Sequence, residues 1–287
     1  MELIAREAPD YEFLDAGNEC RLERFGPHVF NRPSPVALWR PEQPDAWAAA
    51  AGVYRRDRFG GGQWTFPQPI PLTWSIRWDD LVFNIKPTGF GHMGLFPEHS
   101  CHWEWVNAQI RAGRGACRIL HLFAYTGAMT LVAARAGAEV CHVDAVADIN
   151  EWARNNAAAS GLEGAPVRWI TDDATKFVAR EIRRERRYDA IILDPPSYGK
   201  GPHGEKWIIE QHLLGLMDQL LPLMSDTPRF VLFTCHTLGF SPVLMKNLLV
   251  PWAERLGGRL EAGTMTLRNA RCKRALPTGF FARWSAD

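Results

Sequence analysis

The stretch ILHLFAYTGAMTLVAARAGAEVCHVDA, residues 119–145, decides the fold. An apolar strand runs through ILHLF, ends in Ala-Tyr-Thr-Gly and passes directly into the helix-like AMTLVAARAG, after which EVCHVDA forms a second strand. Small residues and a glycine at the end of a core strand indicate that something approaches the backbone there.

The same alternation of strand and helix continues along the chain to residue 257. Five strand–helix pairs are expected, at 118–125 with 127–137, 139–145 with 148–161, 167–173 with 174–187, 188–196 with 205–224, and 229–237 with 241–257. Such repeats predict a parallel sheet covered by helices on both faces. Two strands without a helix between them, 260–269 and 275–284, add an antiparallel pair. The fold class is therefore α/β, with a seven-stranded sheet.

The first part of the chain has a different texture. It is rich in Pro, Gly and Trp, and its short apolar segments are broken by turn residues. These features predict a small β-rich domain over residues 1–85, with one helical insert near residues 44–54, followed by the α/β domain over residues 86–287. The many tryptophans are expected to pack the core of the small domain.

Composition narrows the class of protein. The 287 residues are 46% hydrophobic and 23% charged, and 33 basic residues face 32 acidic ones, for a formal net charge of +1. A strongly basic nucleic-acid binder is not indicated. Six scattered cysteines without a CxxC pair argue against disulfides and a zinc site, so no metal is expected. Because neither a signal peptide nor a membrane-spanning run is visible, we expect a cytoplasmic protein without a membrane partner.

Three successive strand ends carry residues suited to a nucleoside. Gly127 lets the backbone approach a ligand, and Asp144 at the end of the next strand, 17 positions beyond Gly127, can accept both hydroxyls of a ribose. An aspartate in TDDA, at the end of the third strand, can accept a hydrogen bond from an adenine amine. Each feature alone is more often a turn or a helix cap. Because G-x-G-x-x-G is missing, a nucleoside without a diphosphate, such as S-adenosylmethionine, fits better than NAD.

The segments ILHLFAYTGAMTLVAARAGAEVCHVDA, DDATKF, DAIILDPPSYG and FVLFTCHT, in this order, resemble the class I S-adenosylmethionine-dependent methyltransferases. Among them, the chain is most similar to the bacterial group that includes the large-subunit ribosomal RNA cytosine-5 methyltransferases, over Lys86 to Arg283. KPTGFGHMGLFPEHS departs from that group's commoner Lys-Thr-Gly-Phe and Asp-Gln-Arg, and no PUA-type RNA-binding module is visible.

The resemblance implies S-adenosylmethionine as cofactor and a role for each matching residue. Phe123, Ala124, Thr126 and Gly127 would line its methionine end, Asp144 would hold the ribose, and Asp173 with Ala174 would hold the adenine. Asp194 would begin the motif on the substrate side. RNA is the implied substrate.

DPPSYG, residues 194–199, follows a strand without a gap. Pro195 and Pro196 fix an extended turn, so that the Asp194 carboxylate and nearby carbonyls can face a planar substrate on which Tyr198 stacks. Taken alone, the segment is more often a proline-rich turn.

Cytosine carbon 5 is the favoured target, with Cys235, in FTCHT at the end of the fifth strand, as the nucleophile. A thiolate that adds to carbon 6 makes carbon 5 nucleophilic, and the related RNA enzymes keep their nucleophile at this position. Asp194 could stabilise the ring nitrogen during the addition. The competing interpretation is a small buried side chain.

Two other functions remain. DPPSY also resembles the Asp/Asn-Pro-Pro-aromatic motif of amino-methylating enzymes, with Ser197 as an extra residue, and in that case Cys235 has no catalytic role. A non-catalytic nucleoside-binding module is the least favoured. The sequence leaves open the target base, the RNA and the oligomeric state.

Three further segments are interpreted as structural. HSCHW, residues 99–103, lacks a second cluster of metal ligands and is expected to pack. AREIRRERR, residues 179–187, is expected to be a solvated helix face. RNARCKR, residues 268–274, is the better candidate for phosphate contact, although that role is still not favoured.

Overall fold

A computed structural model describes residues 1–57, 61–113 and 115–287. The chain forms two compact units that interleave along the sequence. The α/β unit contains Met1–Leu3, His102–Met265 and Gly279–Asp287, and the β unit contains Ile4–Cys101 and Thr266–Thr278. The predicted division after residue 85 stays a prediction.

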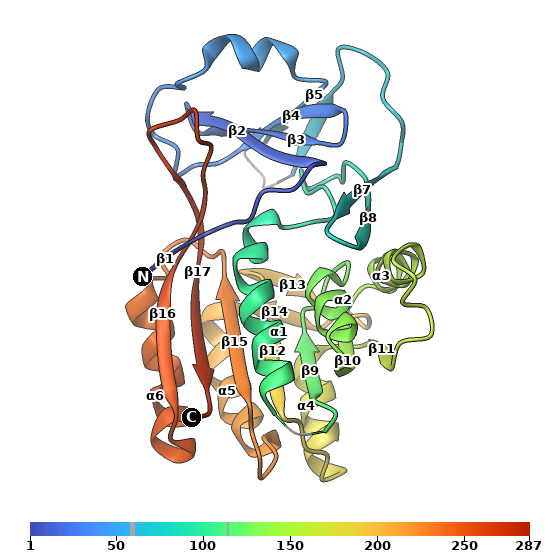
Figure 1. The fold of residues 1–287 in the computed structure, drawn as a ribbon, viewed down its shortest axis with the longest axis vertical. Coiled ribbons are helices and arrows are strands. Elements are labelled where there is room, and N and C mark those ends of the chain that lie inside the picture. Colours follow the sequence, from blue (N-terminus) through green and yellow to red (C-terminus); the bar gives the residue numbers. More distant parts are fainter. Residues whose placement is uncertain (58–60, 114) are drawn as a thin grey trace. The chain divides into compact units, whose positions relative to one another are not determined.

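One eight-stranded sheet forms the centre of the α/β unit (Figure 1). Its strands, in spatial order, are β1 (Glu2–Ile4), β16 (Arg259–Leu267), β17 (Leu276–Ser285), β15 (Phe230–Cys235), β12 (Ala190–Leu193), β9 (Arg118–Leu122), β10 (Glu139–Asp144) and β11 (Val167–Thr171). The five strands from β15 to β11 run parallel, and β17 joins β15 antiparallel. The predicted α/β fold is confirmed. The three-residue β1, too short to stand out in the sequence, adds an eighth strand to the predicted seven.

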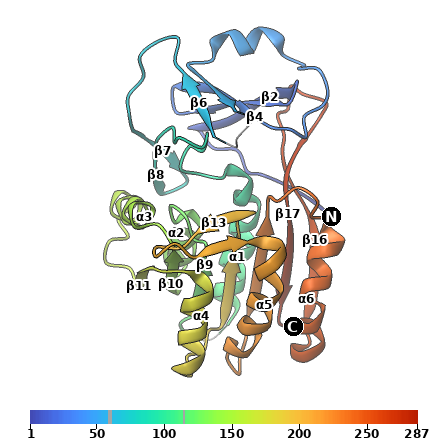
Figure 2. The ribbon, with the colours of Figure 1, turned by 180° about the vertical axis from the view of Figure 1, so that it is seen from behind.

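Helices cover both faces of this sheet, as Figures 1 and 2 show from opposite sides. The helices are α1 (Trp103–Ala112), α2 (Ala128–Arg135), α3 (Ala147–Ala159), α4 (Ala174–Arg183), α5 (Ile209–Leu220) and α6 (Pro242–Leu256). Helices α1 and α2 lie on one face, and α4, α5 and α6 lie on the other. Every residue of β12 and β15 is buried, as expected for central strands with both faces covered.

Alternation along the strands decides which side chains face α4, α5 and α6. The core on that side takes Leu122 from β9, Val143 from β10, Leu193 from β12 and Phe233 with Cys235 from β15. β9 lies between β12 and β10. The chain first adds β10 and β11 on one side of β9 and then adds β12 and β15 on the other side. In open α/β sheets this switch point, at the carboxyl ends of the strands, is where ligands bind.

The β unit contains a five-stranded sheet and a hairpin. The sheet consists, in order, of β2 (Tyr11–Gly17), β3 (Cys20–Phe25), β4 (His28–Pro33), β5 (Gly52–Arg56) and β6 (Gly62–Thr65), and the hairpin of β7 (Trp74–Trp78) and β8 (Leu81–Ile85). A short 3-10 helix, Pro44–Ala49, forms only the first part of the predicted helical insert. The last part, Gly52 to Tyr54, is wrong as a helix, because it pairs with β4 and β6 as the start of β5. Trp78 is fully buried and stacks on Tyr11 at 5.3 Å between ring centroids, as predicted for the tryptophans.

A buried ion pair holds the strands of the β unit together. The Arg32 Nε donates to Glu23 Oε2 over 3.0 Å, and the Tyr11 hydroxyl donates to Glu23 Oε1 over 3.0 Å. Because both carboxylate oxygens are bonded, the buried charge of Glu23 is compensated. The segment RNARCKR also belongs to this unit, where the Arg274 guanidinium pairs with Glu42 at 3.2 Å.

Among the described residues, no helix combines the length and the apolar character that a membrane crossing requires.

Candidate active site

The loop after β9 adopts an unusual backbone conformation. Phe123, Tyr125 and Gly127 have φ values of 53°, 49° and 85°, in the left-handed region. For residues other than glycine this region costs about 1–2 kcal/mol each, so the surroundings must hold the loop in place. The backbone therefore bends sharply between β9 and α2.

Three hydrogen bonds hold this loop. The amide of Ala124 donates to Val143 O over 3.1 Å, and the amide of Tyr125 donates to Asp144 Oδ2 over 2.9 Å. From α3, the buried Asn156 Nδ2 donates to the carbonyl of Thr126 over 3.0 Å. The loop is therefore shaped by its contacts with β10 and α3.

Gly127 is required for two reasons. It is the residue before α2, and its φ of 85° is one that residues with a side chain rarely adopt. In addition, a Cβ at this position would lie only 3.1 Å from the Ala153 Cβ of α3. The structure thus gives the glycine a packing role beside the predicted ligand role, which stays a prediction.

Asp144 lies at the end of β10, beside the loop. Its two oxygens accept from the backbone, Oδ2 from Tyr125 N and Oδ1 from Val146 N over 3.0 Å. Burial nevertheless raises the pKa of the Asp144 carboxyl above its usual range, although these amide bonds act in the other direction. Asp144 and the glycine loop are brought together as the sequence predicts.

The third strand end is tied to the second. The amide of Asp172 donates to Asp144 O over 3.0 Å. Asp173 begins α4 as its cap, and its Oδ1 accepts from the Lys176 amide over 3.0 Å and from the Thr175 hydroxyl. Asp173 is therefore a helix cap, the alternative that the sequence left open, while Ala174 is buried at the first position of α4.

Sequence reasoning missed the polar side chains that support this edge. Asn150 Nδ2 donates to Asp144 O, Ile170 O and Thr171 Oγ1 over 3.2, 3.1 and 2.8 Å, and so joins the ends of β10 and β11. Beneath the loop, the Thr130 hydroxyl bonds to His121 Nδ1 at 2.7 Å and to His142 Nδ1 at 2.9 Å. Burial lowers the pKa of His142 to about 3, so this ring is neutral near pH 7.

The segment DPPSY follows β12 and leads into a hairpin formed by β13 (Tyr198–Lys200) and β14 (Lys206–Ile208). Helix α5 begins only at Ile209, so the helix predicted from residue 205 starts later, because its first residues pair with β13. Pro195 is buried and Pro196 exposed, and Tyr198 has 54% of its surface exposed. An aromatic ring in such a position is available for stacking.

Trp207 of β14, also missed from the sequence, connects this segment with the loop after β9. Its indole N–H donates to Pro196 O over 2.7 Å, and its ring lies 4.9 Å from that of Phe123. A second bond, between the hydroxyls of Ser197 and Thr237 at 2.8 Å, joins DPPSY to the end of β15. The predicted cofactor side and substrate side are thus mechanically linked.

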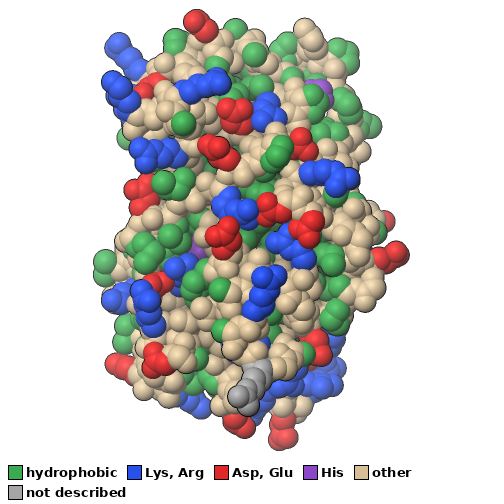
Figure 3. All heavy atoms as spheres, viewed as in Figure 1, with side chains coloured by type: hydrophobic (Ala, Val, Ile, Leu, Met, Phe, Trp, Pro, Cys, Tyr) green, Lys and Arg blue, Asp and Glu red, His purple; other side chains and the backbone are tan. Residues whose placement is uncertain are grey.

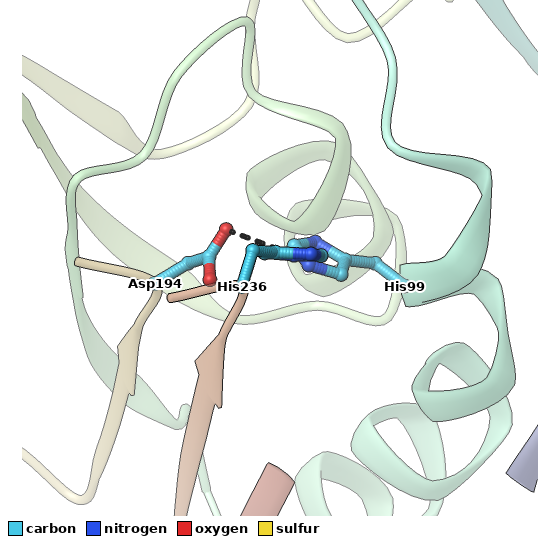
Figure 4. Close-up of side chains that lie close together, drawn as sticks. All are labelled: His99, Asp194 and His236. Atoms are coloured by element: carbon cyan, nitrogen blue, oxygen red, sulfur yellow. Dashed lines mark ion pairs between the residues drawn. The ribbon is translucent and has the colours of Figure 1, made fainter. Parts of the chain in front are cut away.

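His236, directly after β15, is paired with Asp194, directly after β12. His236 Nε2 lies 3.7 Å from Asp194 Oδ2, as Figure 4 shows. His99, also drawn there, belongs to the β unit, where its ring stacks on Phe96 at 5.7 Å. Cys235 has no exposed surface, and burial raises the pKa of its thiol to about 11.

The segments interpreted as structural have partners. In α4 and just beyond it, Arg180 pairs with Asp172, and Arg184 pairs with Glu181 at 3.2 Å. From HSCHW, the buried His102 packs its ring against Phe281 at 4.7 Å.

Comparison with known proteins agrees with this arrangement. Residues 40–235 match the family model of the S-adenosylmethionine-dependent methyltransferases. The crystal structure of a SAM-dependent methyltransferase from Agrobacterium tumefaciens superposes with a TM-score of 0.95 and 37% identity, over 100% of this chain and 94% of that one. A methyltransferase termed SMU.776, crystallised with S-adenosylhomocysteine, shares the fold with a TM-score of 0.70 and 18% identity, over 96% of this chain and 75% of that one.

One curated relative is named as a ribosomal RNA methyltransferase. The ribosomal RNA large subunit methyltransferase K/L of Shewanella baltica is 30% identical over 151 residues, which are 52% of this chain and 20% of the relative. The chain thus spans about a fifth of the length of the curated relatives that it matches.

The matched region contains the loop after β9, Asp144, Asp173, the DPPSY segment and Cys235. These findings support an enzyme over a non-catalytic module and give S-adenosylmethionine as its cofactor. The chain belongs to the S-adenosylmethionine-dependent methyltransferase family, with the class I fold, and is related to the large-subunit ribosomal RNA methyltransferases.

Proposed function

We propose that this enzyme methylates a base in RNA. The observation that carries the proposal is the half-exposed Tyr198, four residues after Asp194, at the end of a segment that Trp207 and Thr237 both anchor. A base that stacks on an aromatic side chain gains about 1–3 kcal/mol, and an adjacent carboxylate can accept a hydrogen bond from its edge. The RNA names of the curated relatives support the same substrate class.

For the cofactor, we propose the roles predicted from the sequence. Phe123, Ala124, Thr126 and Gly127 line the methionine end of the cofactor. Asp144 accepts the ribose hydroxyls, and Asp173 with Ala174 borders the adenine. Support comes from the left-handed backbone of the loop and from the hydrogen bonds between Asp144 and its neighbours.

Of the two chemical routes, we favour methyl transfer to a nitrogen. With a pKa of about 11, the Cys235 thiol at pH 7 has a thiolate fraction on the order of 10⁻⁴. Transfer to an amine needs only a nitrogen lone pair and an acceptor such as Asp194. Methylation of cytosine carbon 5 through Cys235 remains the second route, supported by the place of this cysteine at the end of β15.

RNA binding in this enzyme would rely on local contacts. The net charge is only +1, and on the face seen in Figure 3 basic and acidic side chains are interspersed. We therefore propose recognition through the turn that carries Tyr198 and a few phosphate contacts. The expected cytoplasmic location fits an RNA substrate and stays a prediction.

Labelled methyl transfer tests the proposal. The enzyme is incubated with radiolabelled S-adenosylmethionine and in-vitro-transcribed large-subunit ribosomal RNA, and the digested product is separated into nucleosides. We expect label on a base nitrogen. Replacement of Tyr198 by Ala should lower kcat/KM for RNA about 5- to 150-fold, whereas Tyr198→Phe keeps the stacking ring. Label confined to protein or small molecules would contradict an RNA substrate, and 5-methylcytidine would select the second route.

A further inference from the structure

Methyl transfer from a sulfonium to a neutral base releases a proton. The bond between sulfur and the methyl carbon breaks, its electron pair stays on sulfur as a thioether, and a lone pair of the acceptor forms the new bond. The acceptor nitrogen then carries the positive charge and becomes neutral by losing a proton. A positioned side chain can take that proton, a task for which histidine is the residue used most often.

His236 is placed to do this. Its Nε2 lies 3.7 Å from Asp194 Oδ2, and both side chains are partly exposed, with 26% and 18% of their surfaces accessible (Figure 4). A group that donates a hydrogen bond to Asp194 Oδ2 therefore lies within reach of Nε2. When Nε2 gains a proton, the neighbouring carboxylate stabilises the positive charge of the imidazolium.

The architecture of the α/β unit keeps the ring in this position. β17 pairs with β15 in the register Cys235 to Phe280, which brings Gly279 beside His236. A Cβ at Gly279 would lie 2.9 Å from His236 Nδ1, so the absence of a side chain leaves the space that the imidazole occupies. One residue later, the Thr237 hydroxyl bonds to Ser197 of the turn that begins with Asp194.

We propose that His236 is a catalytic residue whose Nε2 accepts the proton released by the methylated base, with Asp194 orienting the base and stabilising the imidazolium. The inference rests on the proposed transfer to a nucleobase and adds a residue to it. The family resemblance assigns a role to Cys235 but none to His236. Of these two neighbours, Cys235 is fully buried, whereas the His236 side chain is partly exposed.

The test uses the full-length enzyme, radiolabelled S-adenosylmethionine and an RNA, protein and small-molecule extract of bacterial cells. The variants are His236→Gln and His236→Ala, and the matched control is His28→Gln, at a histidine of the β unit that has no role in either proposal. We expect the single-turnover rate of methyl transfer to fall about 10²- to 10⁴-fold in both histidine variants. Added imidazole should restore part of the rate of His236→Ala, an effect that a purely structural role would not produce. Affinity for S-adenosylhomocysteine, from calorimetry, should stay unchanged.

Each outcome decides a proposal. A rate for His236→Gln within about threefold of the wild type would overturn the role of His236, as would the failure of imidazole to raise the rate of a folded His236→Ala enzyme. Label on protein or small molecules alone would overturn the RNA substrate, while the rate ratio on that acceptor would still decide the role of His236. If the wild type labels nothing in the extract, both proposals are wrong.

Discussion

Asp144 shows how one residue can combine two tasks. Its carboxylate accepts the amides of Tyr125 and Val146, and so helps to shape the loop that the cofactor is expected to contact. The same burial that makes this possible raises its pKa. The protonation state of a single side chain should therefore influence both the loop and cofactor binding.

Cofactor affinity should depend on pH through Asp144. Above its raised pKa the group is a carboxylate and can accept ribose hydroxyls, whereas protonation as the pH falls through that pKa removes this capacity. Affinity for S-adenosylhomocysteine should therefore decrease as the pH falls through this raised pKa, which calorimetry over a pH series can measure. In Asp144→Asn, loss of a charge-assisted bond worth about 1.5–3 kcal/mol should weaken binding at neutral pH and flatten the profile. A wild-type profile in this variant would contradict the prediction.

At Gly127, alanine should be more damaging than at a comparable glycine. Both Gly127 and Gly137 have positive φ, 85° and 95°, but an added Cβ meets Ala153 at the first position and nothing within 4 Å at the second. We expect Gly137→Ala to lower the free energy of unfolding by about 1–2 kcal/mol and Gly127→Ala by more, with weaker cofactor binding only at Gly127. Chemical denaturation and calorimetry measure both. Equal losses at the two positions would show that contact with α3 is unimportant.

The thiol of Cys235 offers a test of the reaction route. Because the thiol is fully buried, Cys235→Ala should reduce stability by about 1 kcal/mol, while methyl transfer to nitrogen should continue at nearly the wild-type rate. Labelling assays and thermal unfolding measure the two effects. Loss of activity in a folded variant would support the covalent route instead.

At the scale of elements, the hairpin β13–β14 couples the two sides of the active site. Trp207 bonds to Pro196 and packs on Phe123, and Glu205 at the tip forms an ion pair with Lys176 of α4. The indole ring of Trp207 thus connects the DPPSY segment on the substrate side with the loop after β9 on the cofactor side.

Replacing that indole should separate the hydrogen bond from the packing. Trp207→Phe removes the N–H that donates to Pro196 O but keeps an aromatic ring near Phe123. We expect kcat to fall about 10-fold, as positioning of the turn loosens, with little change in cofactor affinity. Trp207→Ala should lower both. Steady-state kinetics and calorimetry on the two variants distinguish these outcomes, and an unchanged kcat in Trp207→Phe would argue against the coupling.

Local patterns predicted most of the elements of the α/β unit. Apolar strands alternating with helices were enough for the parallel sheet, and Ser241 caps α6 through the Leu244 amide, as Ser-Pro indicates. The hairpin was missed because GEKWI resembles the start of a helix, and only its pairing with Tyr198–Lys200 makes it a strand.

The place of a candidate site residue was predictable where it lies at the end of its own strand or just after it, as at Gly127, Asp144 and Asp194. It was not predictable where the geometry depends on distant contacts. His236 meets Asp194 only because β15 lies beside β12, and Trp207 meets Phe123 only because the hairpin folds back. Such pairs leave no spacing signal in the sequence.

At the scale of the whole molecule, charge limits how RNA can bind. With a net charge of +1, this protein differs from proteins that bind nucleic acid through a large basic surface. Shape and stacking at the turn with Tyr198 are then expected to carry more of the specificity than general attraction to phosphate.

The salt dependence of RNA binding should therefore be shallow. Each phosphate contact contributes a slope of about −0.7 in log K against log salt for single strands, so about four contacts predict a slope near −3. Titration of RNA at several potassium chloride concentrations measures this slope. A value several times steeper would indicate a basic surface that the overall charge conceals.

The bent loop from Phe123 to Gly127 has a consequence for the speed and thermodynamics of cofactor capture. Since its conformation is already imposed by β10 and α3, the cofactor does not have to induce it, and association should proceed in one rapid kinetic phase. Amide protons of this segment should exchange slowly in the empty enzyme and remain slow after loading, as in a receptor that is rigid from the outset.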